Sequence, residues 1–399
     1  MAYRDKPSLS KDEAIKLHKE ALVIDSQQPP ITSGALFTDN MRKALDGWYK
    51  DGLSQDETRG LLSNMIADEI KNSQDARNQY LDLWKKSGVN IASGTYAGPA
   101  KIEDAYQISV NGIANAISII NAIPEKLMLV TTADHIIEAH ETGKYGIIFD
   151  FQDTTPFGTD LNKVDFFYNL GLRVVQLTYN LRNLVGDGCT EIHKSGLSYF
   201  GKELVSKLND MKMLVDVSHC SEQVGWDSME TSNAPVVITH SSSAAVCKHD
   251  RGKSDKLAKA IADNGGFFGV VIIPVFIQDE TPNATLDHWA LHIEHLVNVM
   301  GIDHVCVGTD KMGPGPGTDS LFEYPTEMPE TKVGAFNWSG FREEHRVSPK
   351  YADWKIEGYN DFGDWPNLTI KLAERGFNEE EIRKLLGLNY LRVYKDVIG

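Results

Sequence analysis

The sequence has no long apolar run, no paired-cysteine motif and no excess of positive charge. No stretch of its 399 residues reaches the length needed to span a bilayer. The polar start MAYRDKPSLSKDEAIKLHKEA has no apolar signal core. The formal net charge of −16 argues against nucleic acid or an anionic membrane surface as a partner. We therefore expect a soluble, cytoplasmic protein with a small-molecule substrate.

Cysteine is also scarce, and no two of the four cysteines form a CxxC pair. Three of them lie in or beside apolar, strand-like runs. This pattern favours buried free thiols in a reducing compartment over a disulfide framework. The four are Cys189, Cys220, Cys247 and Cys306.

The sequence does contain eight short apolar runs that alternate with helical segments. Most runs are continuous rather than alternating, as expected for parallel strands that are covered on both faces. The segments between them carry helical spacing, as in 104–123 and 286–301. We predict a single (β/α)8 barrel domain over residues 1–399. The predicted strands are 21–26, 88–93, 145–152, 173–179, 214–219, 236–240, 267–273 and 304–310.

Several segments lie outside this alternation. A helix over 8–21, with Ser10 as its N-cap, is expected before the first strand. A charged amphipathic helix, roughly 54–88, forms an insertion after that strand. The Gly-, Pro- and aromatic-rich segment 311–365 follows the last strand and is long enough to be a lid or an interface. Two helices in 366–399 end the chain.

Polar side chains stand at the carboxyl ends of the predicted strands, where the reactive groups of this fold lie. His219 and His240 end two neighbouring strands, and Asp310 ends the last one. Neutral imidazole is the commonest zinc ligand, and a carboxylate suits zinc or a base role. These three side chains therefore predict a metal site, although each histidine can instead be a structural residue. The other polar strand-end residues are Asp25, Asp150, Gln152 and Tyr179.

A family resemblance rests on the motifs SHCS, THSSSAAVCKHDRG and VGTD, followed by GYNDFGDWPNLTIKLAERGFNEEEIRKLLGLNYLRVY. With these motifs the chain resembles the membrane (renal) dipeptidase family of zinc metallopeptidases. The resemblance covers nearly the whole chain and is most specific from His240 to Arg251. It implies a (β/α)8 barrel, a two-zinc site, hydrolysis of dipeptides and related small amides, and a homodimer.

The resemblance also implies roles for single residues. His219 and His240 match the two histidines that hold one zinc. Asp310 matches an aspartate that binds the other zinc and can take the proton from the attacking water. Arg251 matches the arginine that holds the terminal carboxylate of the substrate. Asn389 matches a common asparagine of the last helix, and we assign it to substrate binding.

Four residues depart from the family pattern. The first strand of the family ends in an Asp-Gly-His-Asn-Asp type of motif, and here Gln27 and Pro29 replace its two metal ligands. Gln152 falls on the bridging glutamate, and Tyr179 falls on a substrate-facing histidine. Two zinc ions need anionic ligands, whereas glutamine is neutral and proline has no side-chain donor atom. We therefore predict that the double zinc site is absent and that Gln152 contacts substrate.

Three hypotheses remain open at this stage. In the first, one divalent metal, zinc by preference, binds His219 and His240 in a hydrolase of a small carboxylated amide, with Asp310 as general base and Arg251 as carboxylate anchor. In the second, a metal-free lyase, isomerase or decarboxylase uses Tyr179, both histidines and Asp310 directly as acids and bases. In the third, the protein binds or assembles without catalysis. A metal that is bound but not catalytic is a further alternative.

Overall fold

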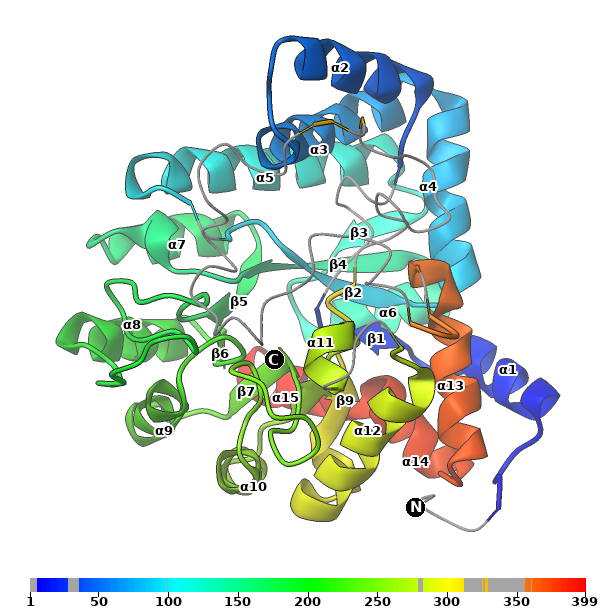
Figure 1. Ribbon diagram of the computed structural model, residues 1–399, viewed down its shortest axis with the longest axis vertical. Helices are drawn as coiled ribbons and strands as arrows, with labels where there is room; N and C mark the ends of the chain where they lie inside the picture. Colours follow the sequence, from blue (N-terminus) through cyan, green and yellow to red (C-terminus); the bar gives the residue numbers. More distant parts are fainter. Residues whose placement is uncertain are drawn as a thin grey trace.

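The computed structural model describes residues 6–27, 36–98, 100–278, 283–311, 325, 327–328, 356–359 and 361–399. Its centre is a sheet of parallel strands that curls into a nearly closed barrel, and helices lie around the outside (Figure 1). Eight strands follow one another around this barrel in chain order. They are β1 (Ile24–Asp25), β2 (Ile91–Thr95), β4 (Tyr145–Phe151), β5 (Leu172–Gln176), β6 (Leu214–Asp216), β7 (Val236–Ser241), β8 (Phe268–Val270) and β9 (Val305–Val307).

The predicted (β/α)8 barrel is confirmed, since each predicted apolar run overlaps one of these strands. The first and last strands are joined by backbone hydrogen bonds: the Ser26 N–H donates to the Val307 carbonyl at 3.0 Å, and the Asp310 N–H donates to the Gln27 carbonyl at 3.1 Å. A further strand, β3 (Leu127–Leu129), pairs with β4 off this path. It was not predicted, because a three-residue run gives too little pattern to recognise.

Helices occupy the segments between the strands, as the sequence predicts. The longer ones are α1 (Lys11–Glu20), α2 (Asp39–Lys50), α3 (Gln55–Asn72), α4 (Gln74–Ser87), α5 (Ile102–Ala122), α6 (Ala133–Thr142), α7 (Asn162–Asn169), α8 (Tyr199–Asp210), α9 (Glu222–Thr231), α10 (Asp255–Asp263), α12 (Leu286–Met300), α13 (Trp365–Glu374) and α15 (Asn389–Val397). The shorter ones are α11 (Pro274–Ile277), α14 (Glu379–Arg383), three 3-10 turns, η1 (Thr155–Phe157), η2 (Ile302–His304) and η5 (Phe362–Asp364), and a π-helical turn, η6 (Lys384–Leu388). No helix among the described residues is both long and apolar enough to cross a membrane.

Helix capping explains where two of these predictions succeed and fail. The Ser10 side chain accepts from the Glu13 N–H, and Glu13 reciprocates, so α1 begins where the sequence predicts. The prediction of a single helix over 54–88 is wrong, because the helix is interrupted at Ser73. Ser73 ends α3, and its hydroxyl accepts from the Ala76 N–H at 3.3 Å to start α4. Most of the predicted 311–365 segment lies outside the described residues.

Alternate residues of the strands belong to two separate buried clusters, as the two-residue period of a strand requires. One cluster packs against α6 and α15, and the other packs against the remaining outer helices. All four cysteines are buried free thiols, as predicted. The strand residues that belong to the first cluster are Ile24, Ile91, Ile148, Val174, Leu214, Val237 and Cys306.

The same face of the strands becomes polar toward their carboxyl ends. Two positions beyond the apolar residues stand Ser93, Asp150, Gln176, Asp216 and Thr239, all of them buried. The Asp150 Oδ2 atom accepts from the Ser93 hydroxyl at 2.9 Å, while its Oδ1 has no hydrogen-bond partner among the described residues. Buried polar atoms without partners are costly, so this layer is maintained at the expense of stability.

Asp150→Asn tests this cost. Burial, partly opposed by the Ser93 hydrogen bond, raises the pKa of Asp150 from 3.8 to about 7. Between those values the folded state holds a proton that the unfolded chain has released, so stability falls as pH rises from 3.8 to about 7. The asparagine side chain has no carboxyl group to ionise, so this loss of stability should be absent in the variant. In chelator-treated protein we expect the change in the free energy of unfolding caused by Asp150→Asn to be more favourable at pH 8 than at pH 4, by on the order of 2–4 kcal/mol. Denaturant unfolding at both pH values measures this difference, and an equal effect at both would contradict it.

Candidate metal and active site

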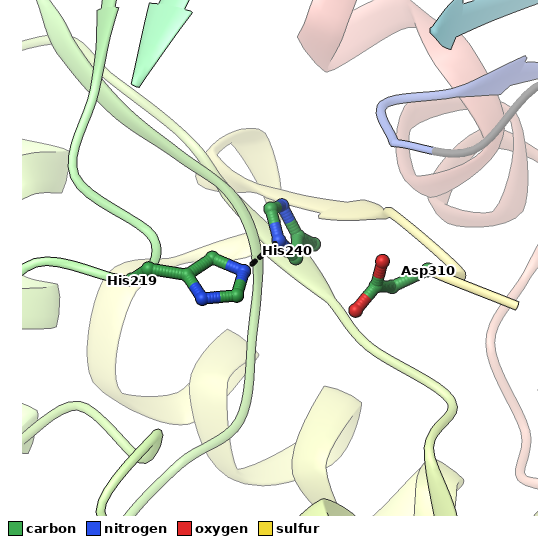
Figure 2. A group of neighbouring side chains, drawn as sticks. All are labelled: His219, His240 and Asp310. Carbon is green, nitrogen blue, oxygen red and sulfur yellow. Dashed lines mark hydrogen bonds between the residues drawn. The ribbon is translucent and has the colours of Figure 1, made fainter. Parts of the chain in front are cut away.

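The carboxyl ends of β6, β7 and β9 bring His219, His240 and Asp310 together (Figure 2). One potential ligand atom from each lies within 4.8 Å of the others, and the two Nε2 atoms are 2.8 Å apart. In the part of the chain that the structure describes, this is the one group of three or more His, Cys, Asp or Glu residues with such spacing. The three residues that the strand-end argument selects therefore converge, although β6 and β9 lie well apart in the sequence.

The environment of the two histidines keeps them neutral. Both are buried. Burial, reinforced by the positive charge of Arg251, holds the pKa of His219 and of His240 well below its usual value. Neutral imidazole is the form that binds metal ions, and it is a weak acid catalyst.

Asp310 is held in an unusual backbone conformation. Its φ is 50°, in the left-handed region that aspartate tolerates better than most residues. The neighbouring Thr309 fixes it, since both its N–H and its hydroxyl donate to Asp25, at 2.9 and 2.6 Å. Such strain is often found at functional sites. Burial, partly opposed by Arg251, raises the pKa of Asp310 to about 7.

Asp25 supports the segment that carries Asp310. Besides its two bonds from Thr309, its carboxylate accepts from the Gln27 N–H at 3.2 Å and from the Trp365 Nε1–H at 3.0 Å. Four donors leave it fully engaged. Its part is to join the end of β1 to the segment that carries Asp310.

Tyr179 and Gln152 lie at the carboxyl ends of β5 and β4. The Tyr179 ring stacks on the His219 ring, with centroids 4.1 Å apart and planes 21° from parallel. Gln152 is buried, and its backbone carbonyl accepts from the Gln176 side-chain amide at 2.6 Å. Tyr179 thus touches a candidate metal ligand directly. The substrate contact of Gln152 stays a prediction.

The Arg251 guanidinium clamps the two segments that carry the histidines. It is buried, and its Nη1 and Nη2 donate to the Ser218 carbonyl at 2.5 Å and the His240 carbonyl at 3.0 Å. Its Nε has no hydrogen-bond partner among the described residues. The arginine therefore has a positioning contact with both segments that the sequence did not indicate. Its contact with a substrate carboxylate stays a prediction.

The assignment of Asn389 to substrate binding is wrong. Its amide donates to the carbonyls of Ile302, at 2.7 Å, and Val305, at 2.8 Å. Val305 begins β9, whereas Asp310 follows the other end of the same strand. Asn389 therefore secures the amino end of the barrel, away from the candidate site. Pro29, the other replaced ligand position on the first strand, lies outside the described residues.

Sequence reasoning missed the residues that bind the far side of each imidazole. Asn180 Oδ1 lies 2.7 Å from His219 Nδ1, and Thr239 Oγ1 lies 2.8 Å from His240 Nδ1. The Thr239 hydroxyl in turn donates to Asp216 at 2.7 Å. The Asn180 and Asp216 contacts join segments of different strands, so no local sequence motif predicts them.

Comparison with known proteins places this chain in a family. The family model described as membrane dipeptidase (peptidase family M19) matches residues 62–326 and 348–398. The chain belongs to the membrane dipeptidase family. The resemblance that the His240–Arg251 motif carries is therefore confirmed.

Individual proteins that are similar to this membrane dipeptidase family member support the same family assignment. Dipeptidase tcpJ of Claviceps purpurea (strain 20.1) is 26% identical over 276 residues, 68% of this chain and 56% of that protein. The uncharacterized dipeptidase C965.12 of Schizosaccharomyces pombe (strain 972 / ATCC 24843) is 30% identical over 276 residues, 67% of this chain and 57% of that protein. The chain thus matches little more than half the length of these curated relatives. The crystal structure of an amidohydrolase from Pseudomonas aeruginosa has a TM-score of 0.71 and 27% identity, covering 98% of this chain and 100% of that chain.

Proposed function

We propose that the protein is a metal-dependent hydrolase of a small carboxylated amide, such as a dipeptide, and that it works with one divalent metal rather than two. The observation that carries this proposal is the convergence of His219, His240 and Asp310 in a family whose named relatives are dipeptidases. Because the aligned part is little more than half of those relatives, the activity itself is part of the proposal.

The three side chains fit a single cation. Two imidazole nitrogens and one carboxylate, with further positions open, are a common donor set for catalytic zinc. A second divalent ion would add two positive charges among buried side chains. Gln27 and Gln152, at two of the replaced ligand positions, are neutral and buried, and the Gln27 amide already donates to Asp150 at 3.4 Å. The residues that remain therefore favour one ion over two, and zinc is the ion we expect.

The reaction would divide among these groups as follows. When bound, the metal would polarise the scissile carbonyl and make its water more acidic. Asp310 would accept the proton of the attacking water and return it to the leaving amine. Arg251 supplies the positive charge that favours a substrate carboxylate nearby. The stacked Tyr179 ring would hold His219 in orientation.

A metal-free lyase or isomerase is the alternative that uses the same residues. It would use the two histidines as acids or bases, together with Tyr179 and Asp310. Both imidazoles are held neutral here, because their pKa values lie well below the usual range. This favours ligation over proton transfer at His219 and His240. A homodimer and a cytoplasmic location stay predictions.

A dipeptide panel tests the proposal. Chelator-treated protein, before and after titration with zinc, would be assayed against dipeptides with free and with amidated C-termini. We expect turnover only after zinc is added, with a higher kcat/KM for a dipeptide with a free carboxylate than for its amidated analogue. Absence of turnover in the zinc-loaded protein would overturn the hydrolase assignment. Equal activity in the metal-free protein would overturn the metal dependence and leave a hydrolase that works without a metal ion.

Arg251→Lys tests the carboxylate contact. Lysine keeps the charge but cannot donate to the Ser218 and His240 carbonyls at once and also offer a fork to an anion. We expect KM for a free-carboxylate dipeptide to rise about 10–100-fold, which corresponds to about 1.4–2.7 kcal/mol. The amidated analogue serves as the matched control. An unchanged KM for the free-carboxylate substrate would exclude Arg251 as its anchor.

A further inference from the structure

We propose that Asn180 and the Asp216–Thr239 pair are positioning residues that fix both imidazoles with the proton on Nδ1, so that both Nε2 lone pairs face one point. The purpose of this arrangement rests on the proposed metal-dependent function. The arrangement itself is a property of the metal-free chain and can be tested without activity.

The first imidazole is fixed by an amide oxygen. Asn180 Oδ1, an atom that can only accept, lies 2.7 Å from His219 Nδ1. The Cys189 thiol donates to the same oxygen at 3.5 Å. All three side chains are buried, so the contact is shielded from bulk water. The proton of neutral His219 therefore lies on Nδ1, and its Nε2 carries the lone pair.

The second imidazole is fixed through a hydroxyl. Thr239 Oγ1 lies 2.8 Å from His240 Nδ1 and 2.7 Å from Asp216 Oδ2. The hydroxyl has one proton, which it donates in a hydrogen bond to the Asp216 carboxylate. The other Asp216 oxygen accepts the Ser218 hydroxyl at 2.6 Å and the Thr239 N–H at 3.0 Å, which locks the carboxylate in place. The Thr239 oxygen is then left to accept from His240 Nδ1–H.

These two assignments change the meaning of the short contact between the rings. The Nε2 atoms of His219 and His240 are 2.8 Å apart. If one ring carried its proton on Nε2, the two would form an ordinary hydrogen bond and satisfy each other. The positioning residues exclude that pair, because both protons are held on the far side. Two lone pairs this close repel unless a cation lies between or beside them, so the site is set to bind a metal ion.

Thr239→Val and Thr239→Ser form the matched test. Valine keeps the shape and removes the hydroxyl, whereas serine keeps the hydroxyl. We expect zinc affinity, measured in competition with a chelator, to fall about 10–100-fold in Thr239→Val and to change less than about threefold in Thr239→Ser. Imidazole ¹⁵N shifts of metal-free, histidine-labelled protein should show Nδ1–H on both rings in the wild type and a mixture or Nε2–H on His240 in Thr239→Val.

Asn180→Ala repeats the test on the other ring and is expected to release His219 alone. An unchanged ¹⁵N pattern together with unchanged zinc affinity in Thr239→Val would overturn the inference. Should Thr239→Val fail to fold by circular dichroism, Asn180→Ala and the wild-type tautomers decide it: Nε2–H on either wild-type ring would overturn it. A wild-type protein that binds no zinc would refute the proposed function, while the tautomers of the metal-free protein would still decide the role of the positioning residues.

Discussion

The double variant His219→Ala, His240→Ala is expected to lose zinc binding and to lose at least about 10³-fold in kcat/KM, or about 4 kcal/mol of transition-state stabilisation. Both nitrogen ligands disappear together, and Asp310 alone cannot hold a divalent ion against its hydration. Each single variant should keep weak, partial binding, because one imidazole and the carboxylate remain. Elemental analysis of purified protein and steady-state kinetics measure the two effects.

His304→Ala is a control for general effects of removing a histidine. His304 lies at the amino end of β9, where its Nδ1 contacts the Gly266 carbonyl at 2.8 Å. It is therefore at the opposite end of the strand that leads to Asp310. We expect this variant to keep its zinc and its activity. Full activity in the double variant would show that the two imidazoles take no part in the reaction.

Asp310→Asn is expected to have the second largest effect, a fall in kcat of about 10²–10⁴-fold with a small change in KM. The substitution removes the proton acceptor and one negative charge but keeps the shape of the side chain. Asparagine also tolerates the φ of 50° at this position, so the backbone should not rearrange. Loss of activity in the variant with zinc still bound can then be assigned to the missing proton acceptor rather than to folding or to metal loss.

The matched control for Asp310→Asn is Asp303→Asn. Asp303 is a surface residue that pairs with Lys384 at 2.9 Å, near the amino end of β9. Exposed ion pairs of this kind contribute little, so activity and stability should stay within error of the wild type. If Asp310→Asn retained wild-type kcat with zinc bound, the general base would have to be another residue, and Tyr179 would be the next candidate.

How much the sequence predicts depends on how local each feature is. The barrel follows from apolar runs with a regular spacing, and the approach of His219, His240 and Asp310 follows from their places at strand ends. Residues that act across strands are different. Asn180 is 39 positions from His219, and Asp216 is 23 positions from Thr239, so no local pattern links them.

Asn389 is a residue that was assigned to the site but lies away from it. The resemblance locates this residue in the last helix but does not say which end of the barrel that helix meets. Hydrogen bonds to Ile302 and Val305 place it at the amino end. Similarly, the sequence predicts one helix over 54–88, and the structure divides it at Ser73, which ends α3 and caps α4.

The number of metal ions per chain tests the central claim most directly. Protein purified without added metal, saturated with zinc and freed of excess ions would be measured by elemental analysis and by native mass spectrometry. The account predicts one ion per chain, lost in the His219→Ala, His240→Ala variant. Two ions per chain would contradict it, since they would show that Gln27 and Gln152 do not prevent a paired site.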